Sequence, residues 1–178
     1  MYNKMAEKNI PCAAIIIIGN EILSGRTKDL NSSYLAQKLL RLGISINEIR
    51  VVKDDKSQII ATLNSLRKKY TYVFTSGGIG PTHDDITADC VAEAFGVPLP
   101  INEEAKKTLA SHYPGGEDDL NGARLRMARI PTGASMIENP ISKAPGFQIE
   151  NVFVLAGVPK IFQVMVNSVL RKLDSTDP

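Results

Sequence analysis

The chain has 178 residues, 43% of them hydrophobic, which is the size and composition of one globular domain with a continuous core. Lysine and arginine outnumber aspartate and glutamate by only 21 to 19, so no overall positive field exists to hold nucleic acid or an anionic membrane, and any anion must be bound locally. The two cysteines, Cys12 and Cys90, lack CxxC spacing and a histidine cluster, which argues against a disulfide framework or a zinc site.

The amino-terminal region carries no sign of a membrane segment. The longest apolar run, residues 10–18, is interrupted by Pro11 and has half the length that a bilayer crossing needs. The region also lacks the small-residue cleavage site of a secretory signal. We therefore expect a cytoplasmic protein with no membrane partner.

The first half of the chain alternates strand and helix patterns. Residues 13–18 form an unbroken apolar run, two alanines and then four isoleucines, typical of a strand buried on both faces of a parallel sheet. A helix is predicted from Asn31 or Ser32 to Gly43, a strand over 44–52, a helix through 59–66 and a strand over 72–75. This alternation predicts a doubly wound α/β sheet.

The second half is less regular. A helix is predicted from Asp85 or Ile86 to Phe95. Residues 102–127 look helical at first and then become polar and glycine-rich around 114–119, which we interpret as an exposed turn. Residues 129–147 are rich in proline and glycine, which favours extended arms and turns. A strand over 152–155 and a helix over 160–173 close the pattern. We expect one domain over residues 10–173, with flexible ends at 1–9 and 174–178.

A glycine-rich loop follows the strand over 72–75, with the sequence SGGIGPTHDDIT at residues 76–87. Glycines permit turns that aim successive N–H groups into one concavity, and the following helix start adds partial positive charge, so the loop is suited to a phosphate. Asp84 and Asp85 would repel a bare phosphate, which suggests an accompanying divalent cation such as Mg²⁺. The alternative is that Asp85 only caps its helix. The candidate phosphate-binding residues of this loop are Ser76, Gly77, Gly78, Gly80 and Thr82.

A second carboxylate pair, Asp54 and Asp55, follows the strand over 44–52. Neighbouring parallel strands end at one edge of the sheet, so this pair and the Asp84–Asp85 pair could converge on one crevice. The candidate metal ligands are Asp54, Asp84 and Asp85. Alternatively Asp54 or Asp55 is the N-cap of the next helix, which does not exclude metal ligation by the other.

Further polar and small residues follow other strands or lie in turns near the end of the chain. The loop over 19–32 mixes glycines, hydroxyls, an amide and basic side chains that could grip phosphate or ring atoms. The turns over 139–147 and 156–159 could approach a ligand through their backbone. The candidate ligand-binding residues in these segments are Gly19, Asn20, Glu21, Lys143, Pro145 and Gly157. His83 and His112 are interpreted as surface side chains, and Cys90 as core packing.

Taken together, the segments GNEIL (19–23), Asn31, GGIGPTHDDIT (77–87), APGF (144–147) and GVP (157–159) resemble the amino-terminal domain of CinA-type competence/damage-inducible proteins. The resemblance runs from about residue 15 to 170. The chain is also similar to the molybdopterin-binding domain of eukaryotic FAD synthases and, more distantly, to MoaB and Mog. It departs from CinA at Asn20, where threonine is expected. We also expect it to lack the carboxy-terminal nicotinamide-mononucleotide deamidase domain, and therefore deamidase activity.

The resemblance implies a three-layer α/β/α fold with a largely parallel sheet and a pocket made by these loops. It places the family's two acidic site positions, which we treat as catalytic, on Asp54 and Asp85. CinA-type domains are associated with metal-dependent cleavage of ADP-ribose and the FAD synthase relative with FAD hydrolysis. The leading hypothesis is a metal-assisted nucleotide pyrophosphatase. The alternatives are a non-catalytic carrier of molybdopterin or a nucleotide, and an adenylyltransferase of molybdenum-cofactor synthesis. By analogy with this fold we expect a homo-oligomer, a dimer or trimer.

Overall fold

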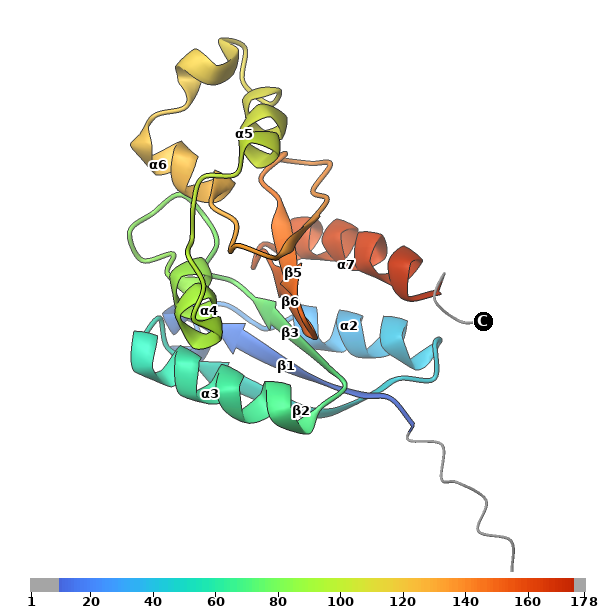
Figure 1. Ribbon diagram of the computed structural model, residues 1–178. Coiled ribbons are helices and arrows are strands. Elements are labelled where there is room, and N and C mark those ends of the chain that lie inside the picture. The colour runs from blue at the N-terminus through green and yellow to red at the C-terminus, as the bar shows by residue number, and fades with distance from the viewer. Residues whose placement is uncertain (1–9, 175–178) are drawn as a thin grey trace, which may run out of the picture.

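The computed structural model describes residues 10–174, which form one mixed six-stranded sheet with helices on both faces (Figure 1). The ends predicted to be flexible lie outside the described residues, apart from residue 174. The sheet order is β2-β1-β3-β6-β5-β4. The strands are β1 (Cys12–Ile18), β2 (Ser45–Val52), β3 (Tyr72–Ser76), β4 (Ser135–Ile137), β5 (Gly146–Ile149) and β6 (Val152–Leu155). The first four strands in the order run parallel, and β5 is antiparallel to both its neighbours.

Two helical layers enclose the sheet, which gives the predicted three-layer α/β/α arrangement. In Figure 1, α3 and α4 lie on one face, whereas α2 and α7 lie on the other. The α-helices are α1 (Asn20–Leu23), α2 (Asn31–Leu40), α3 (Lys56–Lys69), α4 (Thr87–Phe95), α5 (Glu103–Ala110), α6 (Gly122–Leu125) and α7 (Pro159–Asp174). Two 3₁₀ helices, η1 (Gly116–Asp119) and η2 (Arg126–Ala128), complete the described elements.

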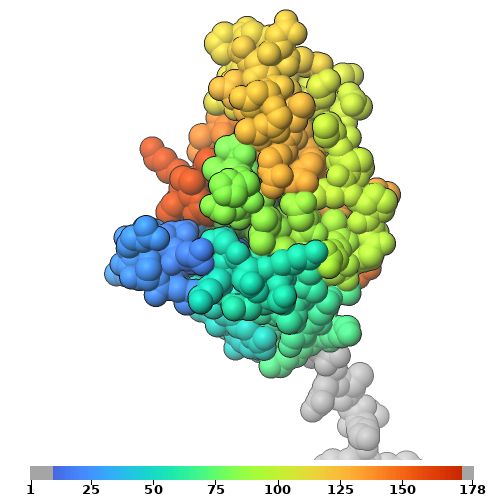
Figure 2. Space-filling model, turned by 90° about the vertical axis from the view of Figure 1, so that its left-hand side faces the viewer, coloured from blue at the N-terminus to red at the C-terminus, as the bar shows by residue number. Residues whose placement is uncertain are grey.

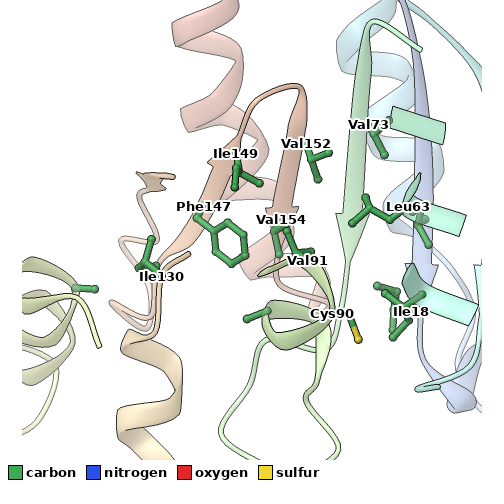
Figure 3. Close-up of a cluster of buried hydrophobic side chains, with 14 of the residues drawn as sticks. Ile18, Leu63, Val73, Cys90, Val91, Ile130, Phe147, Ile149, Val152 and Val154 are labelled. Carbon is green, nitrogen blue, oxygen red and sulfur yellow. The ribbon is translucent and has the colours of Figure 1, made fainter. Parts of the chain in front are cut away.

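Strand β1 is buried on both faces, as its apolar run predicts. Alternate residues point to opposite sides of a strand, so Ile16 and Ile18 join the core under α3 and α4, while Ile15 and Ile17 join the core under α2 and α7. None of these four side chains is more than 3% exposed. Figure 3 shows the first of these cores, in which Phe147, Val154 and Val91 converge with Ile18 and Leu63.

Two strands and one helix lie where loops or extended arms were predicted. Helix α1 is a single turn inside the predicted first loop, and β4 and β5 are short strands within the proline- and glycine-rich stretch. Gly146 opens β5 because a Cβ there would overlap the Val154 carbonyl oxygen of β6 and crowd the Met165 side chain. Glycine in such a sequence usually marks a turn, but at residue 146 it is required because two strands approach each other closely.

A lobe formed by residues 98–132 projects from the sheet at the top of Figure 1 and carries α5, η1, α6 and η2. Its two ends lie side by side, since Ile130 N donates to Pro100 O at 3.1 Å and Thr132 N donates to Pro98 O at 3.0 Å. Buried Leu109 and Ala128 are continuous with the core under α4. The lobe is therefore part of the same folded unit.

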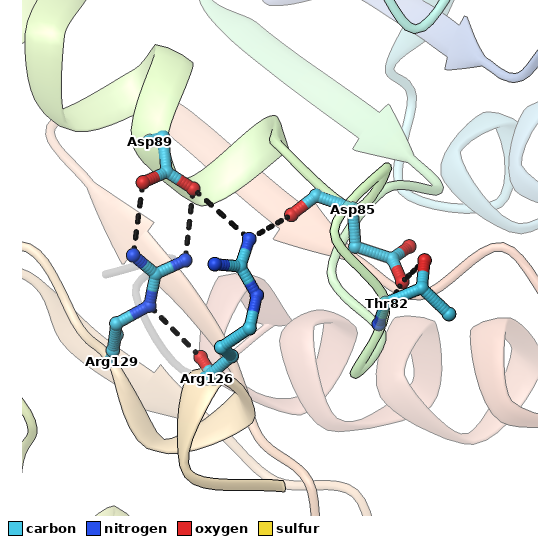
Figure 4. Close-up of polar contacts among 5 residues, drawn as sticks. All are labelled: Thr82, Asp85, Asp89, Arg126 and Arg129. Carbon is cyan, nitrogen blue, oxygen red and sulfur yellow. Dashed lines mark hydrogen bonds and ion pairs between the residues drawn. The ribbon is translucent and has the colours of Figure 1, made fainter. Parts of the chain in front are cut away.

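An ion pair attaches the lobe to α4 (Figure 4). Arg129 donates two hydrogen bonds to Asp89, Nη1 to Oδ1 at 2.9 Å and Nη2 to Oδ2 at 2.8 Å. Partial burial raises the pKa of Asp89, but the hydrogen bonds and charge of Arg129 outweigh it and hold that pKa below its ordinary value. Asp89 is therefore more stable as an anion in the folded protein than in the unfolded chain.

We expect Arg129→Met to lower the free energy of unfolding by about 1–2 kcal/mol at neutral pH, because it leaves a half-buried carboxylate without its bidentate partner. A carboxyl with a depressed folded pKa contributes stability above its unfolded pKa and loses it as the pH falls through the folded value. The difference from wild type should therefore shrink below about pH 4. Urea unfolding of both proteins at neutral and acidic pH measures this difference in unfolding free energy, with Arg171→Met, at an exposed position, as control. An equal loss at both pH values would contradict the ion-pair origin.

Candidate functional site

The loops after four parallel strands enclose a cavity of about 730 Å³ at the carboxyl edge of the sheet. Figure 2 faces the side of the molecule where the first loop (blue), the start of α3 (teal) and the glycine loop (green) come together. The lobe adds Met127 to the wall, and the turn before β5 adds Asn139, Ser142 and Ala144. The other lining residues are 18–21, Arg26, Thr27, Asp54, 77–81, Asp84, Asp85, 156–159 and Ile161.

The glycine loop has the backbone that its sequence predicts. Gly77 and Gly78 have φ angles of +105° and +73°, in the region that glycine alone adopts at little cost. A Cβ on Gly77 would overlap the Ile18 carbonyl oxygen, and one on Gly78 would overlap the Thr87 hydroxyl. Thr87, at the first turn of α4, donates from its hydroxyl to Gly77 O at 2.9 Å and from its N–H to Gly78 O at 2.9 Å. Both glycines are therefore fixed against the start of a helix.

Asn31 ties two of the cavity's loops together. Its Nδ2 donates to Ser76 Oγ at 2.8 Å and to Gly157 O at 2.9 Å, and the residue is only 6% exposed. Gly157 packs backbone to backbone with Gly77, where an added Cβ would lie 3.1 Å from the Gly77 Cα. Asn31 was part of the resemblance but was not among the predicted ligand residues. The structure places it behind the loops as the residue that joins them.

Four carboxylates line the cavity: Glu21, Asp54, Asp84 and Asp85. Burial raises the pKa of Asp54 above its ordinary value, and the negative charges of Glu21, Asp85 and Asp84 raise it further. The N–H of Asn20, which donates to Asp54 Oδ2 at 3.1 Å, opposes this shift only in part. Arg26 is the one basic side chain that lines this cavity among residues 10–174. The site therefore has an excess of negative charge that a cation would relieve.

The structure decides which aspartates cap helices. Asp55 is the N-cap of α3 and accepts a hydrogen bond from Gln58 N at 2.9 Å, so Asp54 is left to face the cavity. Asp85 does not cap α4, which begins two residues later without a side-chain cap, and the capping interpretation is wrong. Its Oδ2 instead accepts from Thr82 N at 2.9 Å and Thr82 Oγ1 at 2.7 Å (Figure 4).

The carboxylates do not form a complete metal cage. Among the residues that the structure describes, no group of three or more histidine, cysteine, aspartate or glutamate side chains is close enough to hold a metal ion. Mg²⁺ commonly uses one or two carboxylates together with waters and the phosphates of its substrate. The oxygen donors in the cavity suit a hard cation of that kind, with the remaining positions left to ligand and water.

Several predicted ligand residues do not line the cavity. Ser76 is buried behind the glycine loop, and the Thr82 hydroxyl is bonded to Asp85. Pro145 lines a small hollow behind the loop, while Lys143 lies between two lining residues and is not itself in the wall. The predicted residues in the wall are Gly19, Asn20, Glu21, Asp54, Gly77, Gly78, Gly80, Asp84, Asp85 and Gly157.

Other side chains considered from the sequence have plain structural roles. The His83 side chain is 92% exposed, and its Nε2 lies 3.4 Å from Asp84 Oδ1. Cys90 is buried in the core, as predicted, and burial raises the pKa of its thiol to about 11, so it stays protonated.

No helix within residues 10–174 is long and apolar enough to cross a bilayer.

Comparisons with known proteins point to one family. The model of a family described as "Probable molybdopterin binding domain" matches residues 14–175. A protein of Metallosphaera sedula is 34% identical over 171 residues, and one of Pyrobaculum calidifontis is 37% identical over 170. These alignments cover 93% and 91% of this chain but only 64% and 65% of those relatives, so the chain spans somewhat less than two thirds of their length.

Solved structures agree with this result. A crystal structure of the protein CinA, of unknown function, from Thermoplasma acidophilum is 34% identical with a TM-score of 0.86, over 93% of this chain and 99% of that one. The tungsten cofactor synthesizing protein MoaB from Pyrococcus furiosus superposes with a TM-score of 0.61 at 21% identity, over 94% of each chain. The second likeness concerns the fold alone.

Proposed function

The chain belongs to the molybdopterin-binding domain family, and on that premise we propose that its cavity binds a nucleotide and hydrolyses the pyrophosphate bond with a divalent cation. ADP-ribose is the proposed substrate, with FAD as the second choice. The observation that carries the proposal is the placement of glycine amides and carboxylates in one cavity. Amides favour an anion, whereas carboxylates favour a cation, and a metal-bound pyrophosphate presents both.

The size and lining of the cavity support a nucleotide. Its volume of about 730 Å³ lies within the range of small-molecule sites. Beside the carboxylates, the wall is apolar at Ile79, Val158 and Ile161, with Met127 contributed by the lobe. An aromatic ring placed against these side chains would leave the phosphates near the glycine loop.

In this proposal Asp54 and Asp85 hold the cation, with Asp84 beside them, and the amides of residues 78–80 neutralise phosphate charge. The Gly77 N–H is not available for this, because it donates to Leu155 O at 3.1 Å. The cation would polarise a phosphoryl oxygen and lower the pKa of a bound water. Thr82 fixes the Asp85 carboxylate through two hydrogen bonds, and Asn20 fixes that of Asp54 through one. Addition of water across the pyrophosphate bond of ADP-ribose yields AMP and ribose 5-phosphate.

The second candidate is a carrier that binds molybdopterin or a nucleotide without turnover. The description of the matched family, which names binding and no reaction, favours it. The carrier would use the same glycine loop and apolar wall.

We expect purified protein to release AMP from ADP-ribose, or more slowly from FAD, when Mg²⁺, Mn²⁺ or Co²⁺ is present, and to leave NAD less changed. Asp85→Asn should lower the rate by at least about 100-fold because the site loses an anionic oxygen, while the thermal unfolding midpoint changes little. Asp118→Asn, in the lobe and away from the cavity, is the matched control. Calorimetry on the same samples distinguishes the candidates: tight binding with no AMP from any substrate would reject the hydrolase in favour of the carrier.

A further inference from the structure

The outer edge of β2 has no strand beside it within the described part of the chain. Strand β2 is the terminal strand of the sheet order, and it is paired only with β1 (Figure 1). Val52 O accepts from Gly19 N, in the loop that follows β1, so the backbone groups of Val52 face inward. Backbone groups alternate in direction along a strand, so those of Ile49 and Val51 face outward. This edge therefore presents donors and acceptors that can pair with another strand.

The same stretch of β2 exposes apolar side chains. Ile49 is 51% exposed and Val51 is 37% exposed. Their partners in register on β1, Ile15 and Ile17, are at most 3% exposed. The helices α2 and α7 thus cover β1 on this face but leave this stretch of β2 exposed. An aliphatic edge strand that remains open is a site of strand addition.

Opposite charges flank Ile49 on the other face of β2. Glu48 and Arg50 are adjacent on this face, with Arg50 Nε 2.6 Å from Glu48 Oε1. Glu48 also accepts hydrogen bonds from Tyr70 and Lys69, and the three contacts lower its pKa to about 2, so it is ionised at neutral pH. The sequence around Ile49 is therefore negative, apolar, positive.

We propose that two copies of this chain associate through β2, antiparallel about a two-fold axis at Ile49. In that register Ile49 lies opposite Ile49 of the second copy, and each Glu48 lies opposite an Arg50. Because the backbone of Ile49 faces outward, the Ile49 pair exchanges hydrogen bonds. The flanking Glu48–Arg50 pairs are then of the non-hydrogen-bonded type, in which side chains approach most closely.

The charges favour this register over the two adjacent ones, and they favour a second copy as the occupant. A two-fold axis at Glu48 or at Arg50 would place like charges directly opposite each other, which is destabilising. The β2–β1 register shifts at Asn47, so the regular outer stretch runs from Glu48 onward. A strand with an acidic and a basic residue in the reverse order satisfies both charge positions, and a second copy of this chain supplies one. The edge is separate from the cavity, so this proposal does not depend on the proposed hydrolysis.

The test is a charge exchange between two variants, measured by sedimentation equilibrium from about 1 to about 100 μM protein. Wild type should be a dimer in this range. Glu48→Arg and Arg50→Glu should each raise the dimer dissociation constant by at least about tenfold, because both cross-strand pairs become repulsive. An equimolar mixture of the two variants should dimerise again, since the two arginines of one variant then lie opposite the two glutamates of the other.

Lys53→Glu is the matched control, because it makes the same charge change just outside β2 and away from the Glu48–Arg50 pairs, and it should remain dimeric. Ile49→Pro provides a variant that keeps Glu48 and its contacts intact: it removes the outward N–H and should be monomeric, while an edge position tolerates proline. The proposal is overturned by a monomeric wild type at the highest concentration, by dimeric Ile49→Pro, or by two monomeric variants that fail to associate when mixed. Circular dichroism verifies that each variant is folded.

Discussion

Asp54→Asn is expected to raise the melting temperature of the ligand-free protein at neutral pH and to lower AMP release by at least about 100-fold. The two effects have one cause. Burial and the nearby charges of Glu21, Asp84 and Asp85 raise the pKa of Asp54, so its ionised form is unfavourable in the folded state. Asparagine removes that charge and keeps an oxygen that can accept from Asn20 N. The same negative charge is what a cation requires.

The pH dependence follows from the direction of the shift. A carboxyl whose folded pKa is raised contributes stability below its unfolded pKa and loses it as the pH rises through the folded value. The melting temperatures of wild type and Asp54→Asn should therefore converge below about pH 4 and diverge toward neutral pH. Asp55→Asn is the control next in sequence, because asparagine replaces aspartate well as an N-cap and Asp55 does not line the cavity. A variant less stable than wild type at neutral pH would refute the electrostatic argument.

Gly77→Ala is expected to lower the free energy of unfolding by about 3 kcal/mol or more and to remove ligand binding. The φ of +105° is costly for any residue with a Cβ, and the added carbon would overlap the Ile18 carbonyl oxygen at the end of the interior strand β1. Neither atom can move freely, because the Cβ is bonded to the Gly77 backbone and the oxygen belongs to the Ile18 backbone, both at the carboxyl edge of the sheet. Such a loss is a large share of the stability of an ordinary domain.

Gly25→Ala is the matched control for this prediction. Gly25 has a φ of +73°, but nothing lies within 4 Å of an added Cβ, so only the backbone conformation is penalised, by about 1 kcal/mol. Urea unfolding of both variants compares the two costs. Equal losses at the two positions would mean that close packing against β1 contributes nothing, and would remove the reason given for glycine at residue 77.

The regular part of the fold was predictable because local pattern and burial agree there. The apolar run that contains Ile15 and Ile16 is typical of a strand buried on both faces, and the structure confirms it. Strands β4 and β5 were not recognised, because they are three and four residues long and β5 begins at Gly146. The pairing of β5 with β6 and of β4 with β5, which no local pattern encodes, is what makes these two segments strands.

The site was predictable in outline and not in detail. Loops that follow parallel strands meet at one edge, and this rule placed Asp54 and Asp85 in one cavity. The rule could not tell whether Asp54 or Asp55 caps the next helix, because both are aspartates at positions that allow an N-cap. It also missed Met127, an apolar residue beyond the predicted exposed turn, because its place in the wall depends on how the lobe folds back.

The adjoining ends of the lobe have a consequence for how this protein can change over evolutionary time. Residues 98 and 132 are joined by a hydrogen bond, so the lobe leaves and rejoins the rest of the fold at nearly the same point. Segments whose ends meet tolerate changes in length and sequence without displacing the scaffold. One wall of the cavity, at Met127, can thus be remodelled by mutation while the strand ends that carry the aspartates and glycines remain in place, so the shape of the cavity can vary independently of its polar groups.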